Sequence, residues 1–245
     1  MNKVYAVGIG PGDYESMTLR AVHTLQRVGM IVGYRAYVEL IRPYFPDKEY
    51  HATAMRGEVE RCRFALCEAC AGRDVALISS GDAGVYGMAG LLFELRAQCE
   101  TPEIEVVPGL TAACTGAALL GAPLTHDFAV ISLSDLLTDW ATIEQRVKAA
   151  AQCGLAIAIY NPASMKRRDN LKRACEAALL HLSPDTVCAV AKNIGRQGEC
   201  VRMMTLRSLS EYQADMFTTA FIGNAATRLI SGNMVTPRGY KLQNV

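Results

Sequence analysis

The chain has 245 residues, enough for one large domain or two of ordinary size, which excludes a peptide or a wholly disordered segment. Its 25 lysine and arginine residues against 24 aspartate and glutamate residues leave a formal charge of +1, which excludes the global basic field of a typical nucleic-acid-binding protein. The nine cysteines are scattered and odd in number, and no secretory leader is evident, so we expect reduced thiols and a cytoplasmic protein.

In the first half of the chain, short apolar runs alternate with longer segments of helical periodicity, which is typical of a mostly parallel sheet with crossover helices. The predicted strands are 3–9, 30–33, 49–54, 74–79 and 104–107, and the predicted helices are 17–28, 58–71 and 85–98. Residues 106–125 carry no charge, but their glycines and prolines favour a loop and a short buried helix at 110–120 over a membrane span. We therefore expect an αβα domain over residues 1–121.

The same alternation begins again after Gly121 and Pro123. The predicted strands are 128–133, 155–160 and 187–191, and the predicted helices are 140–151 and 166–182. Two further β-rich runs, 200–206 and 216–222, follow with a short segment between them, so antiparallel pairing is expected to close this second sheet. The prediction is a second αβα domain over residues 122–245 with a mixed sheet, and an active-site cleft between the two domains.

A glycine-rich turn, Gly8–Asp13, directly follows the first strand. It is not a dinucleotide fingerprint, because Asp13 stands where the third glycine is needed and Pro11 has no N–H for a pyrophosphate. The second strand also ends in Arg35 rather than in an acid that could hold a ribose. An oxidoreductase with a nucleotide cofactor therefore remains only an alternative. Asp13 is a hydrogen-bond acceptor at the carboxyl end of a strand, where open α/β sheets bind their ligands.

Three further loops follow strands in the same way. Ser79–Gly90 contains four glycines and the carboxylate of Asp82 but no lysine or arginine, so it suits a cation or a nucleoside better than a triphosphate. Pro108–Ala113 and Tyr160–Pro162 follow later strands. Each loop alone fits ordinary turn chemistry, but together they indicate a binding cleft.

These segments resemble the tetrapyrrole methylases, the class III S-adenosylmethionine-dependent methyltransferases of corrin and sirohaem synthesis. The resemblance covers essentially the whole chain and is carried by Gly8–Asp13, Ser80–Asp82, Pro108–Ala113 and Pro123–His126, which have the family's order and spacing. Three longer stretches are similar to the branch of the family that methylates C17 of precorrin-3B, or of its cobalt form, and contracts the ring in cobalamin synthesis. They are Ile78–Gly90, His126–Leu137 and Thr236–Tyr240.

The resemblance implies a homodimer that binds S-adenosylmethionine between two αβα domains and methylates a tetrapyrrole, without nucleic-acid or membrane partners. The implied cofactor contacts are Pro11, Ser80, Gly81, Asp82, Val85, Thr111, Ala112, Ser132, Asn161, Ala191 and Pro237. Asp13 and His126 are our candidates for the proton transfers of ring contraction, with a hydrogen-bonded linker residue as the other interpretation of His126. The candidate donors to substrate carboxylates are Arg35, Arg56, Lys192 and Arg238.

The chain departs from the family at one point. The uroporphyrinogen methylases of the family use an aspartate after the second strand and a lysine after the third, whereas here Arg35 and Met55 or Arg56 occupy these places. The acid and base roles of those two residues therefore cannot be assigned to this chain. A methylase acting at C11 or C20, and a tetrapyrrole carrier without chemistry, stay open as alternatives.

The spacing of Cys62, Cys67 and Cys70, with Cys99 beyond, is one that iron–sulfur proteins also use. The surrounding residues favour a helix, however, and on a helix Cys62 and Cys67 diverge by about 140°. We therefore expect no metal.

Overall fold

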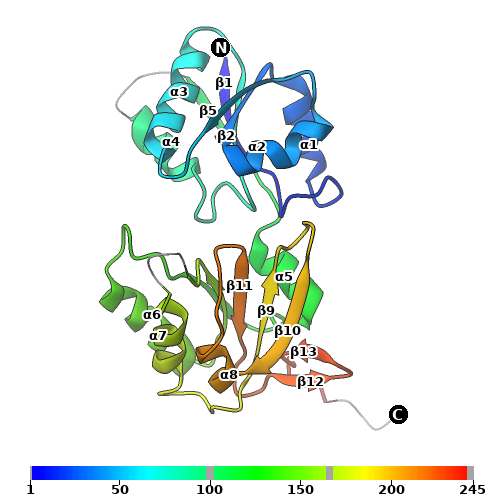
Figure 1. The fold of residues 1–245 in the computed structure, drawn as a ribbon, viewed down its shortest axis with the longest axis vertical. Coiled ribbons are helices and arrows are strands. Elements are labelled where there is room, and N and C mark those ends of the chain that lie inside the picture. The colour runs from blue at the N-terminus through cyan, green and yellow to red at the C-terminus, as the bar shows by residue number, and fades with distance from the viewer. Residues whose placement is uncertain (1, 98–101, 164–167, 242–245) are drawn as a thin grey trace. The chain divides into compact units, whose positions relative to one another are not determined.

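The computed structural model describes residues 2–97, 102–163 and 168–241, which form two compact units, Met1–Ala112 and Ala113–Val245 (Figure 1). The division falls one helix earlier than the boundary predicted at residues 121 and 122. The helix in question is α5 (Ala112–Leu120), whose Gly116 faces Phe221 and Ile194 of the second unit. A Cβ at Gly116 would lie 2.9 Å from the Phe221 ring, so the absence of a side chain lets this helix approach.

The first unit contains a five-stranded sheet in which every pair of neighbouring strands is parallel, as predicted. The strand order is β3-β2-β4-β1-β5. The strands are β1 (Lys3–Gly8), β2 (Met30–Tyr34), β3 (Glu49–Thr53), β4 (Val75–Ser79) and β5 (Glu103–Val107). Side chains alternate between the two faces, so that Val4 and Ala6 enter one core cluster while Tyr5 and Val7 enter another.

Helices cover both faces of this sheet. Residues of α1 (Leu19–Arg27) and α2 (Arg35–Ile41) complete the core on the Tyr5 face, and residues of α3 (Glu58–Cys70) and α4 (Ala89–Arg96) complete the core on the Val4 face (Figure 1). Helix α2 and the 3₁₀ turn at Arg42–Tyr44 were not predicted, because two turns of helix with only Val38 and Ile41 buried leave little periodicity. The helix predicted over 85–98 begins at Ala89, and residue 98 lies outside the described residues.

The second unit contains a mixed five-stranded sheet of order β10-β9-β11-β8-β7. The strands are β7 (Phe128–Ser132), β8 (Ala156–Tyr160), β9 (Val187–Lys192), β10 (Cys200–Thr205) and β11 (Thr218–Ile222). The mixed character is confirmed. The last two strands do not pair with each other, because β9 lies between them and is antiparallel to both. The antiparallel pairing expected of these two strands is therefore made with β9 and not with each other.

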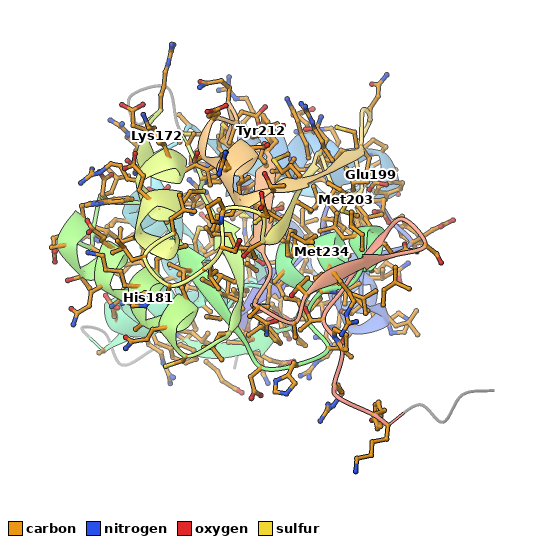
Figure 2. All side chains as sticks on the ribbon, turned by 90° about the horizontal axis from the view of Figure 1, so that it is seen from below. Lys172, His181, Glu199, Met203, Tyr212 and Met234 are labelled. Carbon is orange, nitrogen blue, oxygen red and sulfur yellow. The ribbon has the colours of Figure 1, made fainter. Side chains whose placement is uncertain are left out.

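Helices α6 (Trp140–Gln152), α7 (Asn170–Ala178) and α8 (Leu206–Ser210) share one core cluster with one face of this sheet. Figure 2 labels Lys172 within α7 and His181 just beyond its end. Residues 166 and 167 of the predicted 166–182 helix lie outside the described residues.

A small sheet of order β12-β13-β6 was not predicted. It joins Arg228–Ile230 (β12), Asn233–Val235 (β13) and Gly121–Ala122 (β6), and it buries Met234, which Figure 2 labels. Strands of two or three residues are too short to show alternation in a sequence. Among the described residues, no helix has the length and apolar character needed to cross a bilayer.

Candidate functional site

All predicted ligand-binding loops of the first unit emerge at one end of its sheet. Because the five strands are parallel, their carboxyl ends lie together. This carboxyl end of the first sheet brings together the residues predicted from sequence, Pro11, Asp13, Arg35, Arg56, Ser80, Gly81, Asp82, Val85, Thr111 and Ala112. Strands β4, β1 and β5 are adjacent, so the three glycine-containing loops that follow them are neighbours.

The main chains of these three loops interlock. Gly10 N–H donates to the Gly81 carbonyl at 3.1 Å, and Gly81 N–H donates to the Gly10 carbonyl at 2.7 Å. Gly8 lies so close to the neighbouring loops that a Cβ there would stand 2.6 Å from the Gly81 oxygen and 2.7 Å from the Gly109 nitrogen. The glycines therefore allow backbone-to-backbone contact that any side chain would prevent.

Asp82 joins two of the loops through its side chain. Its Oδ1 accepts from Gly84 N–H at 2.7 Å, and its Oδ2 accepts from Gly109 N–H at 2.9 Å. Gly81 beside it has φ of +70°, a conformation that favours glycine. The carboxylate thus holds the loop after β4 against the loop after β5, a role that sequence reading missed because Gly109 is 27 residues away.

Asp13 is held in a defined position at the same end of the sheet. Its Oδ1 accepts from Ser16 N–H at 2.6 Å, which closes the turn after β1. An open hollow of about 550 Å³ lies beside it and is lined by Asp13, Tyr14, Glu15 and Tyr44. The Tyr14 and Tyr44 rings are half-exposed, with centroids 5.2 Å apart. A carboxylate oriented in this way beside exposed aromatic surface is suited to accept a proton from a flat ligand.

The composition of these loops fits an S-adenosylmethionine-like ligand. A sulfonium is a cation and carries no phosphate, and Ser79–Gly90 contains no basic side chain that would repel it. The close approach of Gly8 and Gly109 to the Gly81 carbonyl leaves main-chain groups, rather than side chains, exposed to a ligand at these loops. Ser80 and Thr111 add hydroxyl groups at the ends of β4 and β5. The residues present therefore fit the group that the family resemblance implies.

Arg35 and Arg56 follow the neighbouring strands β2 and β3 and are exposed. Within the described part of the chain, neither guanidinium has an ion-pair partner. Arg56 has φ of 69°, in the left-handed region that residues with a Cβ rarely adopt. Two exposed arginines without carboxylate partners are well suited to bind the acidic groups of a ligand.

In the second unit, Ser132, Asn161 and Lys192 lie at the same end of the sheet, because β7, β8 and β9 run in the same direction. Asn161 Nδ2 donates to Ser132 Oγ at 2.9 Å. Asn161 has φ of 52°, which asparagine tolerates better than most residues. The preceding residue, Tyr160, accepts from Ala113 N–H at 2.5 Å and so ties the start of α5 to the end of β8. Ala191, by contrast, is fully buried within β9.

Lys192 already has a partner, since its Nζ lies 2.7 Å from Asp215 Oδ2. The hydrogen bond to Asp215 raises the pKa of Lys192. Partial burial raises the pKa of Asp215, but hydrogen bonds from Lys192, Thr218 and Phe217 outweigh it and leave this pKa below its usual value. The ammonium charge that was predicted to meet a substrate carboxylate is therefore largely neutralised.

We expect Lys192→Met to raise the KM for an acidic substrate less than about threefold, because a paired ammonium contributes little further attraction. Asp215→Asn is the matched control and is expected to lower KM by exposing the charge. Steady-state kinetics at fixed ionic strength measure both. A tenfold rise for Lys192→Met would contradict this expectation.

His126, Pro237 and Arg238 lie at the other end of the second unit. His126 precedes β7 and accepts from Asp127 N–H at 2.8 Å through Nδ1. Thr236, next to Pro237, donates to the Pro123 carbonyl at 2.7 Å and hydrogen-bonds Thr227 at 2.8 Å. The loop containing Thr227 in turn contacts Gly154, ahead of β8, through Asn224. The structure brings these residues to one another but not to Ser132 and Asn161, and their ligand roles stay predictions.

The cysteines of α3 do not converge on one point. Cys62 is buried, whereas Cys67 and Cys70 are exposed, and Cys99 lies outside the described residues. No group of three or more His, Cys, Asp or Glu side chains within ranges 2–97, 102–163 and 168–241 is arranged to hold a metal.

Burial also divides the thiols by reactivity. It raises the pKa of Cys62 and Cys175 to about 12 and raises that of Cys188 as well. We expect a thiol-specific disulfide reagent at pH 8 to spare these three in the native protein, because the thiolate is the reactive form. The exposed thiols are expected to react, namely Cys67, Cys70, Cys114, Cys153 and Cys200. Peptide mass spectrometry maps the labelling, and native labelling of Cys175 would contradict the structure.

Comparison with known proteins decides the family. The family model described as Tetrapyrrole (Corrin/Porphyrin) Methylases matches residues 3–210. The chain belongs to this family. The resemblance found in the glycine-rich loops is thereby confirmed, and the chain is a methyltransferase of this family.

Individual relatives agree with this assignment. The chain is 44% identical over 237 residues to the probable cobalt-factor III C(17)-methyltransferase of Salmonella typhimurium, covering 96% of this chain and 98% of that protein. The crystal structure of the methyltransferase CobJ has a TM-score of 0.90 and 35% identity, covering 97% of this tetrapyrrole methylase and all of that chain. A uroporphyrin-III C-methyl transferase from Thermus thermophilus, complexed with S-adenyl homocysteine, shares the fold at a TM-score of 0.70 and 22% identity, with 91% and 92% coverage.

Proposed function

We propose that this tetrapyrrole methylase transfers a methyl group from S-adenosylmethionine to C17 of cobalt-factor III or metal-free precorrin-3B, and contracts the ring, in cobalamin synthesis. The observation that carries the proposal is the match along 96% of the chain to a relative named for C17 methylation of cobalt-factor III. The uncharged, glycine-walled loops at the carboxyl end of the first sheet support it, because they fit a sulfonium ligand.

When bound, S-adenosylmethionine would supply a methyl group on a sulfonium sulfur, and an electron-rich ring carbon can attack that methyl carbon in one step, with S-adenosylhomocysteine as the leaving group. The loops after β1, β4 and β5 hold their own shape through Gly10, Gly81 and Asp82, so they present preorganised main-chain groups to the cofactor. In the second unit, Ser132 and Asn161 present a hydroxyl and an amide that already bond to each other. Alignment of two reactants of this kind supplies roughly 7 to 11 kcal/mol of barrier reduction.

The chain's charged residues serve the second substrate. A precorrin carries acetate and propionate groups, and Arg35 and Arg56 are placed to donate to them from the ends of β2 and β3. Asp13, oriented by Ser16, receives the proton that leaves the substrate during ring contraction. A cytoplasmic homodimer is part of the proposal.

The test is a reaction of the purified protein with cobalt-factor III and S-adenosylmethionine carrying a ¹³C-labelled methyl group. The expected result is release of S-adenosylhomocysteine and a label assigned to C17 by NMR and mass spectrometry. A label at C11 or C20 would reassign the protein within its family. Tetrapyrrole binding without release of S-adenosylhomocysteine would indicate a carrier and contradict the proposal.

A further inference from the structure

Helix α3 buries an arginine that sequence analysis did not single out. The Arg61 side chain is 2% exposed and lies in the row that faces the sheet, together with Cys62, Ala65 and Leu66. Its Nε donates to Thr53 Oγ1 at 2.8 Å, and one terminal nitrogen donates to the Ala54 carbonyl at 3.3 Å. The other terminal nitrogen lies 3.7 Å from Met88 Sδ.

These contacts satisfy the nitrogens but leave the charge uncompensated. A hydroxyl, a carbonyl and a thioether are all neutral, and in the described ranges Arg61 forms no ion pair with a carboxylate. Burial of an unpaired charge is costly, whereas an apolar side chain of similar length would pack at this position without that cost. Stability alone therefore gives no reason for an arginine at this position.

The contacts of Arg61 with Thr53 and Ala54 lie at the start of the loop that carries Arg56. Thr53 is the last residue of β3 and Ala54 is the first residue after it. The planar guanidinium therefore forms hydrogen bonds on both sides of the point where the chain leaves the sheet. Two residues later Arg56 adopts φ of 69°, and Gly57 is the N-cap residue of α3. A left-handed non-glycine residue persists where its surroundings hold it, and such residues gather at ligand sites. Through Thr53 and Ala54, Arg61 holds the start of this loop.

We propose that Arg61 is a positioning residue for the acidic substrate, acting through Arg56. Its guanidinium holds the Ala54–Gly57 loop in the conformation that presents the Arg56 side chain at the carboxyl end of the first sheet. This inference rests on the proposed function, because it assumes that Arg56 binds a carboxylate of the tetrapyrrole. It predicts that Arg61 affects binding of the tetrapyrrole and leaves binding of S-adenosylhomocysteine unchanged.

A double-mutant cycle tests this coupling. Arg56→Ala and Arg61→Met are each expected to raise the KM for cobalt-factor III about tenfold, the effect of one charge-assisted hydrogen bond, with kcat changed less than about threefold. Because both act through the same side chain, the double variant is expected to show about a tenfold rise as well, rather than about a hundredfold. The Kd of S-adenosylhomocysteine, measured by calorimetry, is expected to stay within about threefold in all variants.

Arg61→Lys is the second variant, for the case that Arg61→Met does not fold. It keeps the charge and the apolar stem but lacks the fork that reaches Thr53 and Ala54 together, so it is expected to recover part of the KM loss. If Arg61→Met melts well below the other variants, Arg61→Lys takes its place in the cycle. Multiplicative KM effects, or a KM unchanged by either Arg61 variant, would overturn the role of Arg61. A wild-type protein without methyl transfer contradicts the proposed function instead, and the two failures are therefore distinguishable.

Discussion

Replacement of Asp82 by alanine is expected to weaken S-adenosylhomocysteine binding by about 10- to 100-fold while the fold remains intact. The two carboxylate oxygens accept from Gly84 N–H and Gly109 N–H, and alanine leaves both donors without an acceptor. The loops after β4 and β5 then lose the bond that sets their spacing. A cofactor that is bound by main-chain groups depends on that spacing, so its affinity falls with the order of the loops.

Calorimetry with S-adenosylhomocysteine measures the effect. Asp82→Asn is expected to weaken S-adenosylhomocysteine binding almost as much as Asp82→Ala, because the amide NH₂ of asparagine would face one of the two N–H donors and could not accept from it. Asp74→Ala is the matched control. Asp74 accepts from Lys3 N–H at 2.9 Å at the amino end of the same sheet, so its loss is expected to lower stability while leaving affinity unchanged. Equal affinities for wild type and Asp82→Ala would remove Asp82 from the site.

The largest effect is expected from Gly8→Ala. Its Cβ would lie 2.6 Å from the Gly81 oxygen and 2.7 Å from the Gly109 nitrogen, and neither backbone atom can rotate away. The three loops must therefore separate. Overpacking of this kind costs about 1 to 3 kcal/mol or more, and we expect S-adenosylhomocysteine affinity to fall more than about 100-fold.

Gly29→Ala controls for the loss of a glycine as such. Gly29 lies between α1 and β2 in the same unit, and a Cβ there would meet nothing within 4 Å. Its melting temperature and affinity are expected to match the wild type. Thermal melts and calorimetry on both variants separate a steric effect at the loops from a general effect of glycine replacement. If Gly8→Ala binds S-adenosylhomocysteine with wild-type affinity, the three loops do not form the cofactor site.

The site exists because of strand order. Chain order separates Gly8, Gly81 and Gly109 by dozens of residues, yet β4 and β5 flank β1 and bring all three into contact. Strand β1 therefore lies between the two strands whose loops contact its own. The turn that follows β1, closed by the bond from Ser16 N–H to Asp13, also lines the open hollow beside Tyr14 and Tyr44.

The sequence by itself determined the strands of the two five-stranded sheets, most helices, both sheet types and the family. Alternation and helical periodicity are local patterns, so they can be recognised in the sequence alone. A glycine-rich loop after a strand marks the carboxyl end of a parallel sheet. The sequence did not show α2 or the small sheet of β6, β12 and β13, because elements of two turns or three residues contain too few periods. It also did not show that β9 separates β10 from β11.

Only the tertiary structure decided which groups are partners. The Asp82–Gly109 bond, the Lys192–Asp215 ion pair and the buried Arg61 join residues whose pairing no local pattern encodes. Likewise, it separated His126 and Pro237 from Ser132 and Asn161 by placing them at opposite ends of the second sheet. The physical reason is that each of these contacts depends on how distant segments pack, and packing is a property of the whole core rather than of any stretch of chain.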